Sequence, residues 1–183
     1  SMGKEHLYVW EPEEGMVHEN DGALRLLALC QNEHMRPTAV KEGKIELVAE
    51  ADGCFTVDST RLFSVNMCDE VMIATRGGNS AVKKGDRLAG MRVIPLMIAE
   101  EELAAAERAA EGGPLLSLLP WKIKTAGLIV TGGEVYRGRI EDKFGPVVEA
   151  KLAAYGIKVI KRALCDDDGA MIAGAIADMR GAG

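Results

Sequence analysis

A glycine-rich turn that carries a hydroxyl and a carboxylate is the part of the chain best suited to bind a ligand. Thr131 and Glu134 flank the pair Gly132-Gly133, and Gly138 follows closely. Glycines let the backbone bend sharply and bring its amides close to a ligand, while a carboxylate accepts hydrogen bonds from ligand N–H groups. A purely structural strand-to-helix turn with a solvated Glu134 explains the same residues. On spacing alone, both interpretations stay open.

Two further groups of acids lie where strands are expected to give way to helices. Asp142 precedes a helical segment containing Pro146, and the run Asp166, Asp167 and Asp168 opens the next one. Neighbouring carboxylates suit Mg²⁺, which takes a few protein oxygens and retains waters. Helix capping and the helix dipole also favour acids at these places. The acids are therefore candidates for a metal site or for simple caps.

Basic residues flank the turn and are candidates for binding a phosphate or pyrophosphate. They are Arg137, Arg139 and Lys143. The segment is not a P-loop, because Arg139-Ile140 stands where that motif has Lys-Ser/Thr. It is not a dinucleotide fingerprint either, because no residue separates Gly132 from Gly133. Exposed basic residues are common on loops, so an ordinary solvated role also stays open.

A strand–helix–strand–helix order is expected to position these residues. Leu128, Ile129 and Val130 form a short apolar run, which is typical of a parallel strand covered on both faces. We expect strands near 125–131 and 157–163 and helices near 142–155 and 167–179. A right-handed crossover makes the two strands parallel neighbours. Ligands of open α/β sheets bind at the carboxyl ends of such strands, where the turn lies.

The first 120 residues predict a separate, β-rich domain. Asn20-Asp21 can cap a helix that runs to about Asn32, and a second helix is expected at 100–111. Strands are expected at 44–50, 54–58, 70–76 and 91–98, separated by turns such as Asp52-Gly53. Short strands with frequent turns favour a small barrel or sandwich. We place a domain boundary near residue 120, giving an α/β chain with domains 1–120 and 121–183.

Residues 122–180 closely resemble the molybdopterin-binding domain of molybdenum-cofactor biosynthesis proteins. That family shows a strand, Thr-Gly-x-Glu-hydrophobic, a glycine, an Asp opening a helix, a Gly-x-x-hydrophobic strand and an Asp-Asp pair. The matching positions are Thr131, Gly132, Glu134, Val135, Gly138, Asp142, Gly156, Val159, Asp167 and Asp168. The upstream segment VKKGDRLAGMRVIPLMI also looks like the leading region of a bacterial molybdopterin-binding protein.

The resemblance implies a three-layer βαβα domain that binds molybdopterin or its adenylylated form. It implies either adenylyl transfer from ATP, yielding AMP-linked pterin with Mg²⁺, or insertion of molybdate-derived metal. The resemblance implies catalytic roles for Asp142 and Asp167. It implies Mg²⁺ binding by Asp142, Asp167 and Asp168. Cofactor contacts fall to Thr131, Gly132, Gly133, Glu134 and Gly138. A non-catalytic molybdopterin carrier or sensor is the alternative, and a hydrolase of nucleotide pyrophosphates a third.

The family domain continues past the position of Gly183 into a strand and a second Gly-Gly loop. We therefore expect a truncated domain, a fragment that is inactive by itself and holds half of its pocket. The family also has Asp-x-Asn where this chain has Asp142-Lys143-Phe144, so one polar contact differs. Family members are commonly oligomeric, which predicts a homo-oligomer.

Composition restricts the remaining possibilities. The 183 residues are 48% hydrophobic and 27% charged, as in an ordinary globular protein, and no apolar run has the length of a membrane span. Four scattered cysteines favour a reducing cytoplasm. The net charge of −6 is uneven: residues 1–120 carry −8, whereas 121–183 carry +2, which suits an anionic ligand. Aromatics at 4%, with no basic patch, disfavour nucleic acid.

Overall fold

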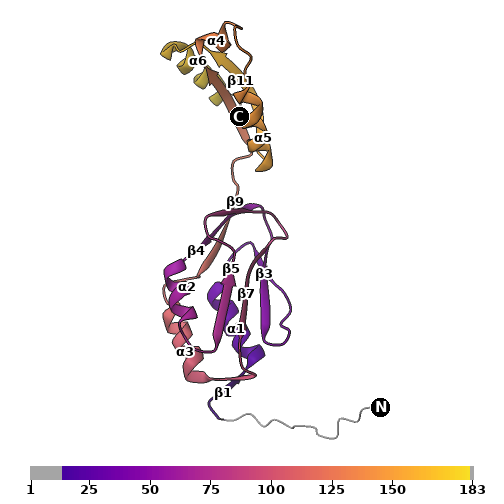
Figure 1. Cartoon of the computed structure of the whole chain (residues 1–183), viewed down its shortest axis with the longest axis vertical. Coiled ribbons are helices and arrows are strands. Elements are labelled where there is room, and N and C mark those ends of the chain that lie inside the picture. Colours follow the sequence, from indigo (N-terminus) through magenta and orange to yellow (C-terminus); the bar gives the residue numbers. More distant parts are fainter. Residues whose placement is uncertain (1–13, 182–183) are drawn as a thin grey trace, which may run out of the picture. The chain divides into compact units, whose positions relative to one another are not determined.

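The computed structural model of the protein describes residues 14–181, which fall into two units, Ser1–Pro120 and Trp121–Gly183 (Figure 1). The first unit contains β1 (Met16–His18), α1 (Glu19–Cys30), β2 (Met35–Pro37), β3 (Lys44–Ala49), β4 (Gly53–Val57), α2 (Ser59–Asn66), β5 (Val71–Thr75), β6 (Ser80–Val82), β7 (Arg87–Val93), β8 (Met97–Ala99), α3 (Glu100–Ala109) and β9 (Leu116–Pro120). The second contains β10 (Thr125–Thr131), α4 (Gly133–Tyr136), α5 (Phe144–Ala154), β11 (Lys158–Cys165) and α6 (Gly169–Arg180). The expected α/β class is confirmed.

The strands of the first unit form three open antiparallel sheets. Their orders are β2-β3-β7-β5, β6-β4-β9 and β1-β8. No closed barrel forms among the described residues of this unit. The strand pairs join distant segments, such as β4 with β9 and β3 with β7. Local alternation predicted β3, β4 and β5, and a strand at 91–98 that overlaps the end of β7 and β8. It missed β1, β2, β6 and β9, and it holds no information about such long-range partners.

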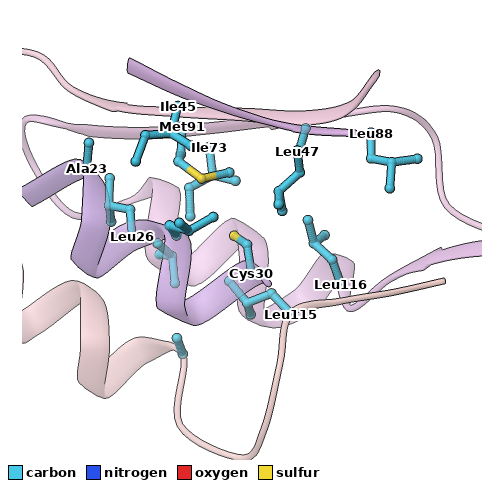
Figure 2. Packing of buried hydrophobic residues seen from close by; sticks show 14 of the residues in the cluster. Ala23, Leu26, Cys30, Ile45, Leu47, Ile73, Leu88, Met91, Leu115 and Leu116 are labelled. Carbon is cyan, nitrogen blue, oxygen red and sulfur yellow. The ribbon is translucent and has the colours of Figure 1, made fainter. Parts of the chain in front are cut away.

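The hydrophobic core of the first unit lies between α1 and the four-stranded sheet. Ala23, Leu26 and Cys30 are fully buried at helical spacing on one face of α1. They face sheet residues such as Ile45 and Met91, which alternate with less buried positions along their strands (Figure 2). Each element therefore presents an apolar face, and the two faces bury one another.

Arg61 ties α2 to the end of α3. Its guanidinium donates to the carbonyl oxygens of Ala110 and Gly113 at 3.0 and 2.8 Å, and its Nε donates to Asp58 at 2.9 Å. The last carbonyls of a helix have no partner within the helix, so an arginine at this place satisfies them. Asp58 in turn caps the start of α2. One side chain thus fixes the ends of two helices.

The outer edge of β5 is closed by a side chain. The carboxamide of Asn66 accepts from the N–H of Ile73 and donates to the C=O of Ile73, both at 2.9 Å. It therefore copies the two hydrogen bonds that a neighbouring strand would make. Unpaired sheet edges invite pairing with other chains, and blocking them is a recognised protection. Asn66 serves this role at the centre of β5.

Replacing Asn66 by alanine tests this closure. We expect Asn66→Ala to lower the free energy of unfolding by about 1–2 kcal/mol, because both polar groups of Ile73 lose their partner. Denaturant unfolding followed by far-UV circular dichroism measures the change. Thr60→Ala, at an exposed position of the same helix, is the control and should be nearly neutral. Equal stability of the two variants would contradict a stabilising role for Asn66.

The second unit is a parallel pair of strands with helices on both faces. β10 and β11 pair in parallel from Thr125↔Lys158 to Thr131↔Cys165. Neighbouring strand residues point to opposite faces. Arg162 reaches Glu149 on α5, whereas Lys161 pairs with Asp178 on α6. Helices α5 and α6 therefore cover opposite faces of the sheet (Figure 1).

Few side chains of the second unit are buried. Cys165 is the one large apolar residue below a tenth exposed within 121–181. Its exposed apolar residues are Ile123, Tyr136, Ile140, Phe144, Val147, Tyr155, Ile160, Leu164, Met171 and Ile176. Within residues 14–181, no helix combines the length and apolar character needed to cross a bilayer.

Candidate functional site

The carboxyl ends of β10 and β11 bring the glycine turn and the acid run together. Thr131 and Cys165 are register partners at the last position of both strands. The N–H of Gly132 then donates to the carbonyl of Cys165 at 3.1 Å, which extends the pairing by one residue. Segments 34 positions apart thus begin at the same edge, where open α/β sheets bind ligands.

The turn after β10 is a tight, hydrogen-bonded bend. Gly132 has a φ of +145°, in the region that favours glycine. Tyr136 and Arg137 donate to the carbonyls of Gly132 and Gly133 at 2.9 and 3.1 Å, so α4 is a single helical turn. The amides of residues 133–135 have no acceptor within the described part of the chain. These amides are therefore available to a ligand, and their binding of one stays a prediction.

The predicted cofactor residues lie along this bend. Thr131 and Glu134 are exposed, and Gly138 has a φ of +70° where the bend ends. The carbonyl of Glu134 accepts from the N–H of Arg139 at 2.8 Å, which closes the loop after α4. The carboxylate of Glu134 has no partner among residues 14–181, so it is free to accept from a ligand. These residues share one surface, although their ligand contacts stay a prediction.

The acid nearest to the turn is Asp166. Its carboxylate accepts from Arg137 Nη2 at 2.8 Å and from the N–H of Asp167 at 2.9 Å. The Asp167 amide, together with the guanidinium, holds the pKa of Asp166 below its usual range. A Cβ on Gly133 would lie 2.7 Å from Asp166 Oδ1, so any other residue here would require this carboxylate to move. The sequence placed Asp166 in the acid run but assigned the ligand roles to Asp167 and Asp168, although Asp166 directly follows the strand.

The other two acids of the run have different environments. Asp168 caps α6, because its carboxylate accepts from the N–H of Met171 at 2.8 Å. The Asp167 carboxylate is exposed and has no hydrogen-bond partner among the described residues. Residues 14–181 contain no group of three His, Cys, Asp or Glu side chains placed to hold a metal ion. The assignment of Mg²⁺ to Asp142, Asp167 and Asp168 stays a prediction.

Asp142 joins the start of α5 to β11. One carboxylate oxygen accepts from the N–H groups of Phe144 and Gly145, both at 2.9 Å, and the other pairs with Arg162. Its side chain is only 5% exposed. The Gly145 amide is the main cause of a lowered pKa for Asp142, with further help from Arg162. In this arrangement Asp142 positions the loop before α5, and its catalytic role stays a prediction.

Arg162 was not predicted as part of the site. It lies on β11, 20 positions after Asp142, and its other nitrogen approaches Glu149 at 3.8 Å. A Cβ on Gly145 would collide with Asp142 and Arg162. A basic residue inside a strand next to a covering helix is the signal that could have found it, because such a charge needs a partner.

Comparison with known families agrees with the motifs of the second unit. Residues 127–182 match the family described as "Probable molybdopterin binding domain". The resemblance inferred from the motifs is confirmed. The match begins inside β10 and continues through the bend, α5, β11 and α6. It covers roughly a third of the chain, so it describes the second unit and not the first.

A solved structure shows a weaker likeness. The molybdopterin biosynthesis moeA protein from Pyrococcus horikoshii OT3 aligns at 12% identity with a TM-score of 0.27. The alignment covers 90% of this chain and 64% of that one, so this chain spans less than two thirds of its length. A likeness at this level supports no conclusion about fold or function. No curated protein sequence matches the chain.

The pairing of Asp142 with its partners predicts a pH dependence for the second unit. Because the folded pKa of Asp142 is lowered, its contribution is present above the unfolded value of about 3.9 and is lost as pH falls through the folded pKa. We expect Asp142→Asn to lower the unfolding midpoint at pH 7. The difference from the unchanged protein should shrink below about pH 4.

Trp121 fluorescence gives a readout specific to this unit. Trp121 packs edge-on against Tyr155 with ring centroids 5.6 Å apart, and Trp10→Phe removes the other tryptophan. Glu141→Gln, an exposed neighbour, is the control and should leave the midpoint unchanged. A pH-independent effect of Asp142→Asn would argue against the charge of Asp142 as its cause.

A methyl group at Gly133 tests the close approach of Asp166. We expect Gly133→Ala to lower the free energy of unfolding of the second unit by about 0.5–1.5 kcal/mol, because the added carbon displaces the Asp166 carboxylate from its hydrogen bonds with Arg137 and Asp167. The same Trp121 signal measures it. Gly169→Ala, where a Cβ meets nothing within 4 Å, is the matched control and should be neutral or slightly stabilising.

Proposed function

We propose that the second unit binds molybdopterin, or its adenylylated form, and that the chain takes part in molybdenum-cofactor biosynthesis. The family match over residues 127–182 supports this proposal. The observation that carries it is the meeting of the glycine bend with the acid run at one sheet edge, through the Thr131↔Cys165 pair. This is the arrangement that the motifs require if both are to reach one ligand.

The proposed contacts divide the ligand into a heterocyclic and an anionic part. Glu134, whose carboxylate is exposed, accepts from the amino and ring N–H groups of the pterin. The amides of the bend and the Thr131 hydroxyl hold polar groups of the ligand, while Gly132 and Gly133 keep the backbone accessible. Asp142 fixes the loop that follows. In this scheme the protein orients its ligand and supplies no nucleophile of its own.

Two chemistries fit such a site. One is adenylyl transfer from ATP to the pterin phosphate, and the other is insertion of metal from molybdate. For either, positioning and charge stabilisation are the main contributions of a protein. A non-catalytic carrier or sensor uses the same contacts without turnover. Homo-oligomer formation and a cytoplasmic location also stay predictions.

The acids present do not assemble a magnesium site by themselves. Asp142 is held by Arg162 and two amides, Asp166 by Arg137, and Asp168 by the start of α6. Mg²⁺ in nucleotide enzymes is often held by one or two carboxylates together with substrate phosphates. Of these four aspartates, Asp167 is the one whose carboxylate has no partner among residues 14–181. No step is assigned to the metal.

Removing the charge of Glu134 tests the binding proposal. We expect the full chain to bind molybdopterin, and Glu134→Gln to weaken the affinity about tenfold or more, because a charged acceptor is lost. Quenching or enhancement of the pterin fluorescence measures the dissociation constant. Glu141→Gln is the control, with the same change of charge outside the bend. If neither the unchanged chain nor the control bound the pterin, the proposal would fail.

Turnover separates the enzyme from the carrier. The full-length protein is incubated with molybdopterin, ATP and molybdate, and the products are separated by chromatography. Formation of adenylylated pterin or of metal-loaded cofactor supports the enzyme. Tight binding with the pterin recovered unchanged supports the carrier or sensor.

A further inference from the structure

One ion pair joins the two halves of the candidate site. Arg137 lies at the end of α4, and Asp166 is the first residue after β11. Arg137 Nη2 and Asp166 Oδ2 are 2.8 Å apart, with side chains 56% and 27% exposed. The pair therefore spans from the glycine bend to the acid run at the surface.

The Asp166 carboxylate lies directly on the backbone of the bend. Its Oδ1 is 2.7 Å, and the Arg137 guanidinium 3.8 Å, from the place where a Cβ of Gly133 would be. Any anion that reaches the bend must approach this carboxylate. The protein thus holds a negative charge of its own where an anionic ligand would arrive, and like charges repel.

Arg137 has the donors to hold a second anion. A guanidinium offers five N–H donors, and the described residues use one of them, on Nη2. Arg162, by contrast, is paired with both Asp142 and Glu149 and is less exposed. Among Arg137, Arg139 and Lys143, only Arg137 has a side-chain ion-pair partner within residues 14–181, and that partner, Asp166, lies after the other strand.

We infer that Arg137 binds the phosphate end of the ligand and that Asp166 competes with that phosphate for the guanidinium. The inference rests on the proposed function and names the group recognised at this end of the site. In the free protein Asp166 orients Arg137. A phosphate ester, with up to two charges and three acceptor oxygens, replaces the carboxylate as the partner of Arg137. Asp166 then opposes binding through its charge, which limits affinity and favours release.

Inorganic pyrophosphate is the probe, titrated into the full chain at low salt by isothermal calorimetry. Arg137→Gln should weaken binding about tenfold, because a charge-assisted hydrogen bond is lost. Asp166→Asn should strengthen binding roughly threefold to tenfold, because the competitor loses its charge. Lys158→Gln, exposed at the start of β11 and so at the end of the strand away from the bend, is the control and should have little effect. Arg137→Lys should restore part of the binding, since it keeps a charge without the fork of donors.

The sign of the Asp166→Asn effect decides the inference. A purely structural Asp166 would make this variant bind more weakly, as Arg137→Gln does, and that result would overturn competition. Equal binding by all variants would overturn the role of Arg137. The unfolding midpoint read from Trp121 shows whether each variant is folded. If Asp166→Asn does not fold, Asp166→Ser provides the same test of sign.

Titration of the same variants with molybdopterin separates this inference from the proposed function. If the unchanged chain binds molybdopterin but the substitutions of Arg137 and Asp166 do not change its affinity for pyrophosphate, the proposed function is retained and the competition is rejected. If the variants change the pyrophosphate affinity as expected but no molybdopterin binds, the proposed function is rejected and the anion site is retained.

Discussion

The shared ending of β10 and β11 is the constraint on which the candidate site depends. Parallel pairing places Thr131 opposite Cys165, and one more backbone hydrogen bond, from Gly132, locks the start of the bend. A shift of one residue in this register would send alternate side chains to the other face and separate Gly133 from Asp166. The bend and the acid run are chemically ordinary by themselves. Their juxtaposition is what makes a site.

Sequence reasoning found the elements of the second unit because their signals are local. An apolar run marks β10, and glycines mark the bend after it. Local signals could not decide which of the three adjacent acids faces the bend, since each of them suits the start of a helix. Which one faces the bend depends on Arg137, 29 positions away, and on the absence of a Cβ at Gly133. Arg162 was not predicted for the same reason, because only the crossover between the two strands brings its partner Asp142 close to it.

In the first unit the local pattern predicted strands and helices but not how the sheets assemble. Alternating residues locate β3 and β7, yet nothing in them specifies that β9 pairs with β4 across about sixty residues. The closing of β5 by Asn66 is likewise invisible in sequence, since asparagine after a helix normally indicates a turn or cap. Side chains that replace backbone partners can be recognised only when the backbone positions are known.

The two units are held together internally by different forces, and this bears on the site. The first buries a continuous apolar core, whose members run from Ala23 to Leu118 in the sequence, and hydrophobic burial responds little to pH. The second buries few side chains, so its loops are positioned mainly by charged hydrogen bonds such as those of Asp142 and Asp166. Exposed ion pairs weaken with salt and with protonation. The contacts that assemble the candidate site are therefore ionic, and a charged ligand can change the geometry of the site by competing for them. A site held by apolar packing would be more rigid, but it would contain no carboxylate that a phosphate could displace.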